Sequence, residues 1–182
     1  MEAYMKRYGG GRKEIDVVDI DKGIGIKDNS LFVISGYATG NTGTVITIPS
    51  ITSWISDYEF KVQYNDSGHA QRHLYIDIQI NSQTKYGKIK SFDMEIKGSS
   101  SASTYGLPFG EYYSNVYDSS GYKEQLFNNA SSNTNTYNKT ITGLTCNGFL
   151  IRTVTGDRWS TYNGNYMTFK IEKLFLTNIK YE

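Results

Sequence analysis

The sequence of 182 residues contains one cysteine, two prolines and almost no net charge. Because Cys146 has no second cysteine to pair with, no disulfide can form within the chain. Nineteen basic residues oppose 18 acidic ones, and the net charge of +1 excludes the strongly basic surface that binds nucleic acid. No apolar run approaches the length of a membrane span, and the first residues lack the apolar segment of a signal peptide. The sequence therefore predicts neither nucleic-acid binding nor membrane insertion.

A convincing helical period is also missing, and apolar residues alternate with polar ones instead. In the runs 58–64, 74–80 and 92–96, apolar and polar residues alternate without interruption, and short polar turns join the runs. This pattern is typical of an antiparallel meander with one solvent-exposed face. Similar runs predict further strands at 14–20, 31–35, 44–48, 123–127, 136–144, 149–155 and 166–181. With 16 tyrosines and 18 glycines, the chain is predicted to be all-β: an antiparallel β-sandwich with minimal helix, forming a single domain over 14–182.

The last strand is the one on which the sandwich is expected to close. Residues 166–181 (YMTFKIEKLFLTNIKY) alternate up to an interruption at Lys173-Leu174, which predicts a β-bulge or a very tight turn near 172–174. The ending LFLTNIKYE resembles the end of jelly-roll modules of the carbohydrate-binding-module-like or concanavalin-like kind. Such modules occur in phage virion and tail proteins and in secreted glycan-binding proteins. The resemblance implies a jelly roll, and a structural calcium ion is frequent in modules of this kind.

Residues 1–13 precede the sandwich as a basic, aromatic arm around the run Gly9–Gly11. A glycine-rich terminus is usually ordered only when something holds it. Contact with a neighbouring subunit and docking on its own domain are both open at this point.

Two stretches rich in aromatic and small polar residues, 98–147 and 156–165, are predicted as loops, the first with strands at 123–127 and 136–144 within it. Aromatic faces pack on the C–H surfaces of sugars, while planar amide, guanidinium and carboxylate groups form hydrogen bonds with the hydroxyls. The candidate ligand-binding residues are therefore Asp157, Arg158, Trp159, Tyr162, Asn163 and Asn165, together with Tyr112 and Tyr113. In the alternative interpretation Trp159 plugs the rim of the sandwich and the tyrosines cover the sheet or an interface.

Metal binding and catalysis have less support. Asp19, Asp21 and Asp28 could hold a structural calcium ion, but Gly23 stands where an EF-hand needs a ligand, so no cofactor is expected. Cys146 has no histidine near it in the sequence, since the two histidines are His69 and His73. Five acidic residues of the alternating strands occupy outward positions and are expected to be solvated: Asp57, Glu59, Asp77, Asp93 and Glu95.

These observations favour a function without catalysis. The leading prediction is a structural or surface module of a virion, plausibly of a phage, that forms a homo-oligomer or binds other virion proteins and contacts host cell-surface glycans. A secreted polysaccharide-binding module appended to a larger protein is the alternative, and a small glycan-active hydrolase is a third possibility. The expected location is a virion or the extracellular space.

Overall fold

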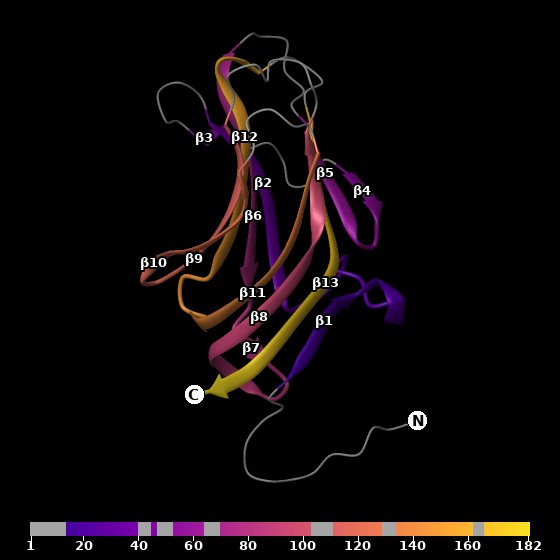
Figure 1. The fold of residues 1–182 in the computed structure, drawn as a ribbon, viewed down its shortest axis with the longest axis vertical. Helices are drawn as coiled ribbons and strands as arrows, with labels where there is room; N and C mark the ends of the chain where they lie inside the picture. Colours follow the sequence, from indigo (N-terminus) through magenta and orange to yellow (C-terminus); the bar gives the residue numbers. More distant parts are fainter. Residues whose placement is uncertain are drawn as a thin grey trace.

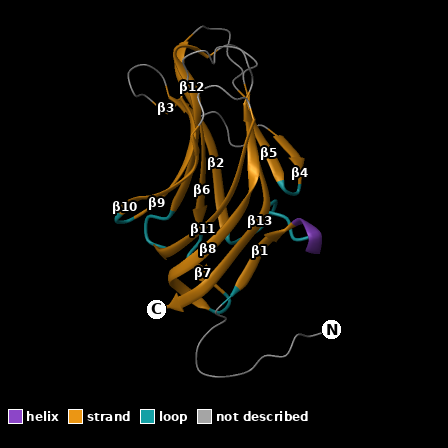
Figure 2. Ribbon diagram, viewed as in Figure 1, coloured by secondary structure: helices purple, strands orange, loops and turns teal. Residues whose placement is uncertain are grey.

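The computed structural model describes residues 14–39, 45–46, 53–63, 70–102, 111–128, 134–161 and 166–182. Within these ranges two antiparallel β-sheets pack against each other, and one 3₁₀ turn at Ile20–Lys22 is the helical element (Figures 1 and 2). The prediction of an all-β antiparallel sandwich with minimal helix is thus confirmed.

The first sheet, sheet A, has the strand order β11-β8-β13-β5-β4, with β1 paired to β13 and β7 paired to β8. Its strands are β1 (Ile15–Asp19), β4 (Ser53–Ser56), β5 (Glu59–Gln63), β7 (Gln83–Thr84), β8 (Gly87–Ala102), β11 (Thr134–Thr145) and β13 (Tyr166–Tyr181). The second sheet, sheet B, has the order β10-β9-β12-β6-β2-β3. Its strands are β2 (Phe32–Thr39), β3 (Val45–Ile46), β6 (Ala70–Ile80), β9 (Glu111–Asp118), β10 (Gly121–Asn128) and β12 (Leu150–Thr161).

The pairings of eight strands are nested along the chain. Strand β5 pairs with β13, β6 with β12, β8 with β11, and β9 with β10. Taken in chain order, these eight strands lie in sheets A and B alternately, except that β9 and β10 follow each other in sheet B. The turn between β9 and β10 is therefore the midpoint of the nested pairing. The chain therefore runs as one long antiparallel hairpin, and the further pairs β8–β13 and β9–β12 close it upon itself.

Strand β13 is the centre of sheet A. It pairs with β8 over most of its length, with β5 at one end and with β1 at the other (Figure 1). The register against β8 shifts between Ile171 and Lys173, so Glu172 is the extra residue of a bulge, as the interrupted alternation predicted. A second shift lies between Thr177 and Lys180, where Asn178 adopts a positive φ of 49°.

The core lies between the inner faces of the two sheets. The predicted inward row of β6 is confirmed, because Leu74, Ile76, Ile78 and Ile80 are at most 9% exposed. Phe169 on β13 packs its ring against those of Phe60 and Tyr137, at 5.9 and 5.4 Å between ring centroids. Each fully buried side chain of this size contributes roughly 1.5–3 kcal/mol relative to an exposed one.

The stretch 98–147 differs from the prediction of a long loop with two strands. Both predicted strands are present and longer, but β8 continues to Ala102 and β9 was not predicted. Gly98 and Ser100 are small because the inner face of β8 is crowded there: a Cβ on Gly98 would clash with the carbonyl oxygen of Lys170. Ser100 is buried and its hydroxyl donates to the carbonyl of Thr168 at 2.6 Å. Close packing therefore accounts for the small residues at these two positions of β8.

Candidate functional site

The segment predicted as a binding loop, 156–165, is partly strand. Strand β12 continues to Thr161, with Gly156 opposite His73 and an irregular register between Asp157 and Thr161. The expectation of a loop is therefore wrong up to Thr161, because these residues extend the ladder with β6. The side chains of Asp157, Arg158 and Trp159, and the whole of Tyr162, Asn163 and Asn165, lie outside the part of the chain that is described. Their role in binding stays a prediction.

The two predicted tyrosines of β9 point to opposite faces of sheet B. Tyr112 points into the core, is 1% exposed, and donates its hydroxyl hydrogen to the Ser100 hydroxyl at 2.8 Å. Its ring packs edge-on against Phe127, so Tyr112 is a core residue, and no ring face is left for a ligand. Tyr113 lies half-buried on the outer face, opposite Val154 of β12.

Of the three candidate calcium ligands, Asp19 has partners within the protein. Asp19 caps the 3₁₀ turn, accepting from the backbone N–H of Asp21 at 3.1 Å and of Lys22 at 3.3 Å. The Lys22 ammonium lies 3.1 Å from Asp19 and 3.0 Å from Asp16, and its hydrogen bond lowers the pKa of Asp19. Asp21 and Asp28 do not join it in a metal cluster: across the described ranges, no three His, Cys, Asp or Glu side chains are placed to share a metal ion.

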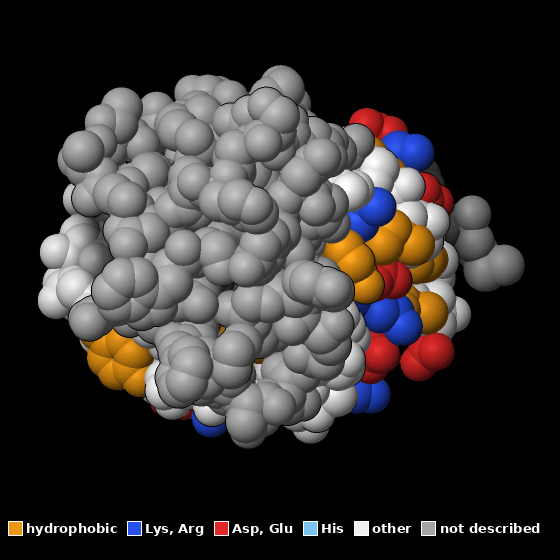
Figure 3. Space-filling model, turned by 90° about the horizontal axis from the view of Figure 1, so that it is seen from above, with side chains coloured by type: hydrophobic (Ala, Val, Ile, Leu, Met, Phe, Trp, Pro, Cys, Tyr) orange, Lys and Arg blue, Asp and Glu red, His pale blue; other side chains and the backbone are white. Residues whose placement is uncertain are grey.

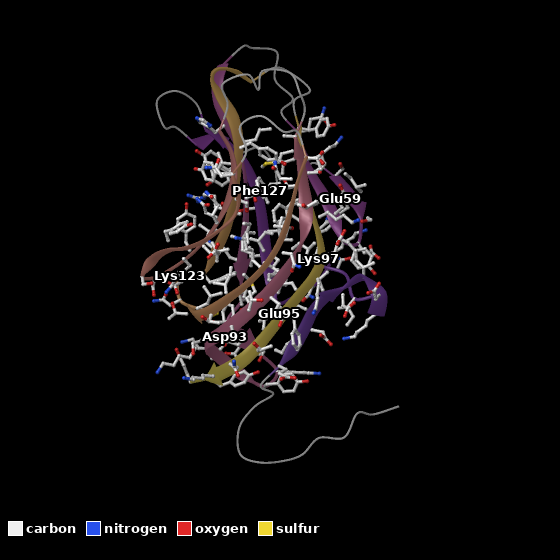
Figure 4. The ribbon with its side chains drawn as sticks, in the orientation of Figure 1. Glu59, Asp93, Glu95, Lys97, Lys123 and Phe127 are labelled. Carbon is white, nitrogen blue, oxygen red and sulfur yellow. The ribbon has the colours of Figure 1, made fainter. Side chains whose placement is uncertain are left out.

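The outer face of sheet A is a solvated, ion-paired surface. Asp93, Glu95 and Lys97 follow one another at outward positions along β8 (Figure 4). Glu95 pairs with Lys173 at 3.2 Å, and Lys97 pairs with Glu172 at 3.3 Å. Seen from above, basic and acidic side chains are intermixed with hydrophobic ones on the side of the molecule that carries β4 and β5 (Figure 3). Charges balanced in this way are expected of a face in contact with water.

The outer face of sheet B has a different composition, which is organised in three rows that cross the strands. The registers define a central row of polar residues: Ser35, Asp77, Arg152, Asn115 and Gln125. On one side lies an upper row: Tyr37, Tyr75, Val154, Tyr113 and Asn128. On the other side lies a lower row, in which Val33 pairs with Gln79, and Tyr117 pairs with both Leu150 and Tyr122. A polar row is thus flanked by two rows that carry aromatic and aliphatic side chains.

Arg152 and Asp77 form the centre of this face. The guanidinium donates from Nε to Asp77 Oδ1 at 2.8 Å and from Nη2 to Oδ2 at 2.7 Å. Tyr37 adds a hydrogen bond from its hydroxyl to Oδ2 at 3.1 Å. The sequence predicted Asp77 to be solvated, but it is 6% exposed because these partners cover it. Burial, with the neighbouring carboxylate, raises the pKa of Tyr37 to about 12, and the hydrogen bond with Asp77 raises the pKa of Arg152, so both remain donors near neutral pH.

The upper row supports this centre by stacking. The rings of Tyr37 and Tyr75 are parallel, with an interplanar angle of 3° and 4.7 Å between centroids. The guanidinium of Arg152 lies 5.6 Å from the centroid of the Tyr75 ring, close enough for a cation–π contact. The planar groups of three neighbouring strands therefore stand side by side and hold one another in place.

Two polar atoms of this face lack a hydrogen-bond partner: Nδ1 of His73 and Oδ1 of Asn115. The amide nitrogen of Asn115 donates to the hydroxyl of Tyr117 at 3.1 Å, so half of the amide is satisfied. A buried polar atom without a partner costs about 1–3 kcal/mol. Among the described residues these are the buried side-chain polar atoms left without a partner, and both belong to outward positions of sheet B.

The lower row is the exposed part of the face. Val33 and Tyr122, at its two ends, are 55% and 58% exposed. The ring of Tyr122 meets that of Tyr117 edge-on at 6.1 Å. A solvent-accessible aromatic side chain beside the uncharged polar side chains of the central row is a combination suited to binding a ligand that has both apolar and hydroxyl surfaces.

Comparison with known proteins finds no family that matches the sequence and no curated protein that matches it. In the described part of the chain, no helix is long and apolar enough to cross a membrane. Functional interpretation therefore depends on the geometry of the outer face of sheet B.

Proposed function

We propose that this protein is a non-catalytic jelly-roll module that binds carbohydrate with the outer face of sheet B. The observation that carries the proposal is the three-row arrangement of that face, in which aromatic rows flank the polar row around Arg152 and Asp77. Sugar rings offer C–H surfaces that pack on aromatic side chains and hydroxyls that hydrogen-bond to planar polar groups. The arrangement matches that pair of requirements.

The nested strand pairing supports the jelly roll. A jelly roll is a double sheet of eight strands wound as two Greek keys. Strands β5, β6 and β8–β13 number eight, divide four to each sheet, and pair first with last and second with second-last. In this interpretation β1 to β4 and β7 are additions at the margins of the eight-stranded unit.

Binding without catalysis is supported by the state of the central carboxylate. Glycoside hydrolysis needs a pair of carboxyl groups placed across the scissile bond. Asp77 accepts three hydrogen bonds from Arg152 and Tyr37, which leave it little freedom to act as an acid or a nucleophile. The virion setting and self-association expected from the sequence remain proposals, and self-association is tested separately below.

Affinity electrophoresis tests the proposal. The protein would be run through native gels containing soluble neutral polysaccharides (mannan, xyloglucan, dextran) or acidic ones (alginate, polygalacturonate), and we expect retardation in at least one. Tyr122→Ala removes an exposed side chain of the face, and Ile55→Ala, which is 53% exposed on the opposite sheet, is the matched control. Tyr122→Ala should lose retardation and Ile55→Ala should keep it. Free migration of the wild type in every gel, or equal retardation of both variants, would overturn the proposal.

A further inference from the structure

The two charged side chains in the three rows of sheet B form an ion pair with each other. Among the described residues of its three rows, Arg152 is the cation and Asp77 the anion, and two parallel hydrogen bonds join them. The carboxylate is more deeply buried than the guanidinium, whose side chain keeps 35% of its surface exposed. The edge of Arg152 that faces water therefore offers N–H donors without a free positive charge. An anionic ligand would gain little from this site, because the charge of Arg152 is already neutralised.

The remaining polar groups of the face have the same preference. The Asn115 amide has one unsatisfied atom, and His73 has an unsatisfied ring nitrogen. Both atoms are buried, so the polar groups of the row that a ligand can reach are neutral ones such as the amide of Gln125. A neutral amide pairs with a hydroxyl that either donates or accepts, whereas a carboxylate or sulfate can only accept. Gln125 next to Asn115 adds a second amide to the same row.

The polar row is also long. It crosses five adjacent strands, β2, β6, β12, β9 and β10, and four strand spacings of about 4.8 Å give it a length of about 19 Å. This exceeds the size of a single sugar ring. Polar residues continue over the whole length, from Ser35 at one end to Gln125 at the other, so a chain of several sugars can be hydrogen-bonded along it.

We infer that the ligand is an uncharged, extended polysaccharide that lies across the strands; this inference rests on the proposed function. Asp77 sets the specificity for an uncharged ligand by neutralising Arg152. Removing the negative charge of Asp77 alone frees the guanidinium and changes the preference towards acidic glycans. Removing both charges restores the neutral preference.

The test compares the wild type, Asp77→Asn, and the double variant Asp77→Asn/Arg152→Gln in gels of neutral and acidic polysaccharides at low and high salt. Asp93→Asn is the matched control, since Asp93 is also a carboxylate held by hydrogen bonds, from Asn178 and the Gly143 N–H, but lies on sheet A. We expect the wild type to bind neutral polysaccharide independently of salt. Asp77→Asn should bind alginate about tenfold more tightly than the wild type, in a salt-dependent way, and the control should behave as the wild type.

Chain length is tested on the wild type alone by calorimetric titration with a size series of neutral oligosaccharides from the retained polysaccharide. Affinity should rise from the monosaccharide to an oligomer that fills the row and then level off. Salt-sensitive binding of the wild type to acidic polysaccharide only, or equal affinity for monosaccharide and oligomer, would overturn the inference while leaving a carbohydrate-binding face in place. No binding to any polysaccharide would remove the proposed function itself. The wild-type salt dependence decides the charge question even if Asp77→Asn fails to fold.

Discussion

Arg152 of β12 lies directly opposite Asp77 of β6 and holds its carboxylate with two hydrogen bonds, at 2.8 and 2.7 Å. The pair occupies the outer surface of sheet B, yet Asp77 is as well buried as many core residues. This relationship joins the stability of the sheet to the chemistry of its surface, and it gives the first prediction.

Replacing Asp77 by Ala should lower the free energy of unfolding by about 2 kcal/mol, the scale of losing hydrogen bonds to a charged group. The variant leaves the Arg152 guanidinium and the Tyr37 hydroxyl without their acceptor. Urea unfolding checks the prediction, with Asp57→Ala as the control because Asp57 is exposed. An Asp77→Ala midpoint equal to that of the wild type would show that the pair contributes nothing to the fold.

The second prediction concerns the inner face of the same strands. Ile78 is 0% exposed, and Ile78→Ala should cost about 2–5 kcal/mol through lost burial and the cavity it leaves. Val33→Ala, on the outer face of the neighbouring strand β2, should change stability by less than about 0.5 kcal/mol, since Val33 is 55% exposed. If the denaturant unfolding curves of the two variants had the same midpoint, the assignment of inner and outer faces would be contradicted.

The third prediction is a pH dependence centred on Asp118, whose side chain is fully buried beside Lys123 at 3.3 Å. Burial alone would raise its pKa, but hydrogen bonds from the backbone of Thr145 and from Ser120 outweigh burial and lower the pKa to about 2. A carboxylate whose pKa is depressed by folding stabilises the protein above the pKa of the unfolded chain, near 3.9, and loses this contribution as the pH falls.

We therefore expect about 2 kcal/mol of stability from Asp118 at neutral pH, decreasing between about pH 4 and pH 2. Asp118→Asn should be less stable than the wild type at pH 6, and the difference should shrink on acidification. Unfolding curves of both proteins across this range measure it. A difference that is constant with pH would mean that ionisation of Asp118 is not the source.

The fourth prediction concerns residues 1–12, which lie outside the described part of the chain. Their deletion should leave the thermal midpoint nearly unchanged and weaken self-association, as expected if the run Gly9–Gly11 contacts a neighbouring subunit. Sedimentation velocity and thermal unfolding of the truncated protein are compared with those of the full chain. An unchanged particle size combined with a lower melting temperature would mean that the arm stabilises its own domain.

The sequence was sufficient to predict an antiparallel β-sandwich and most of its strands, but not which residues meet across the strands. Alternation identified the inner row of β6 and the bulge at Glu172, because both depend on local periodicity. It also placed Tyr75 and Asp77 at outward positions. Arg152, however, is 75 residues from Asp77, and Tyr37 is 40 residues from it, so their association depends on strand order, which no local pattern encodes.

The errors in strand assignment have a related cause. At the end of β8 and over the whole of β9 the sequence pattern predicts a loop, because serine, glycine and tyrosine are common there. In the fold, Gly98 and Ser100 are small so that Tyr137, Tyr112 and the backbone of β13 can approach closely. The aromatic type of Tyr112 alone suggests a binding residue, whereas its burial follows from the side of β9 on which it lies.

The central claim is that carbohydrate binds the outer face of sheet B, and chemical-shift mapping tests it most directly. A ¹⁵N-labelled sample would be titrated with a neutral oligosaccharide taken from the polysaccharide that retards the protein. The side-chain signals of Arg152, Asn115 and Gln125 should shift in a saturable way, together with the backbone amides of the three rows, while those of Asp93 to Lys97 on sheet A stay in place. Shifts confined to sheet A, or to residues 156–165 with the three rows unaffected, would contradict the account.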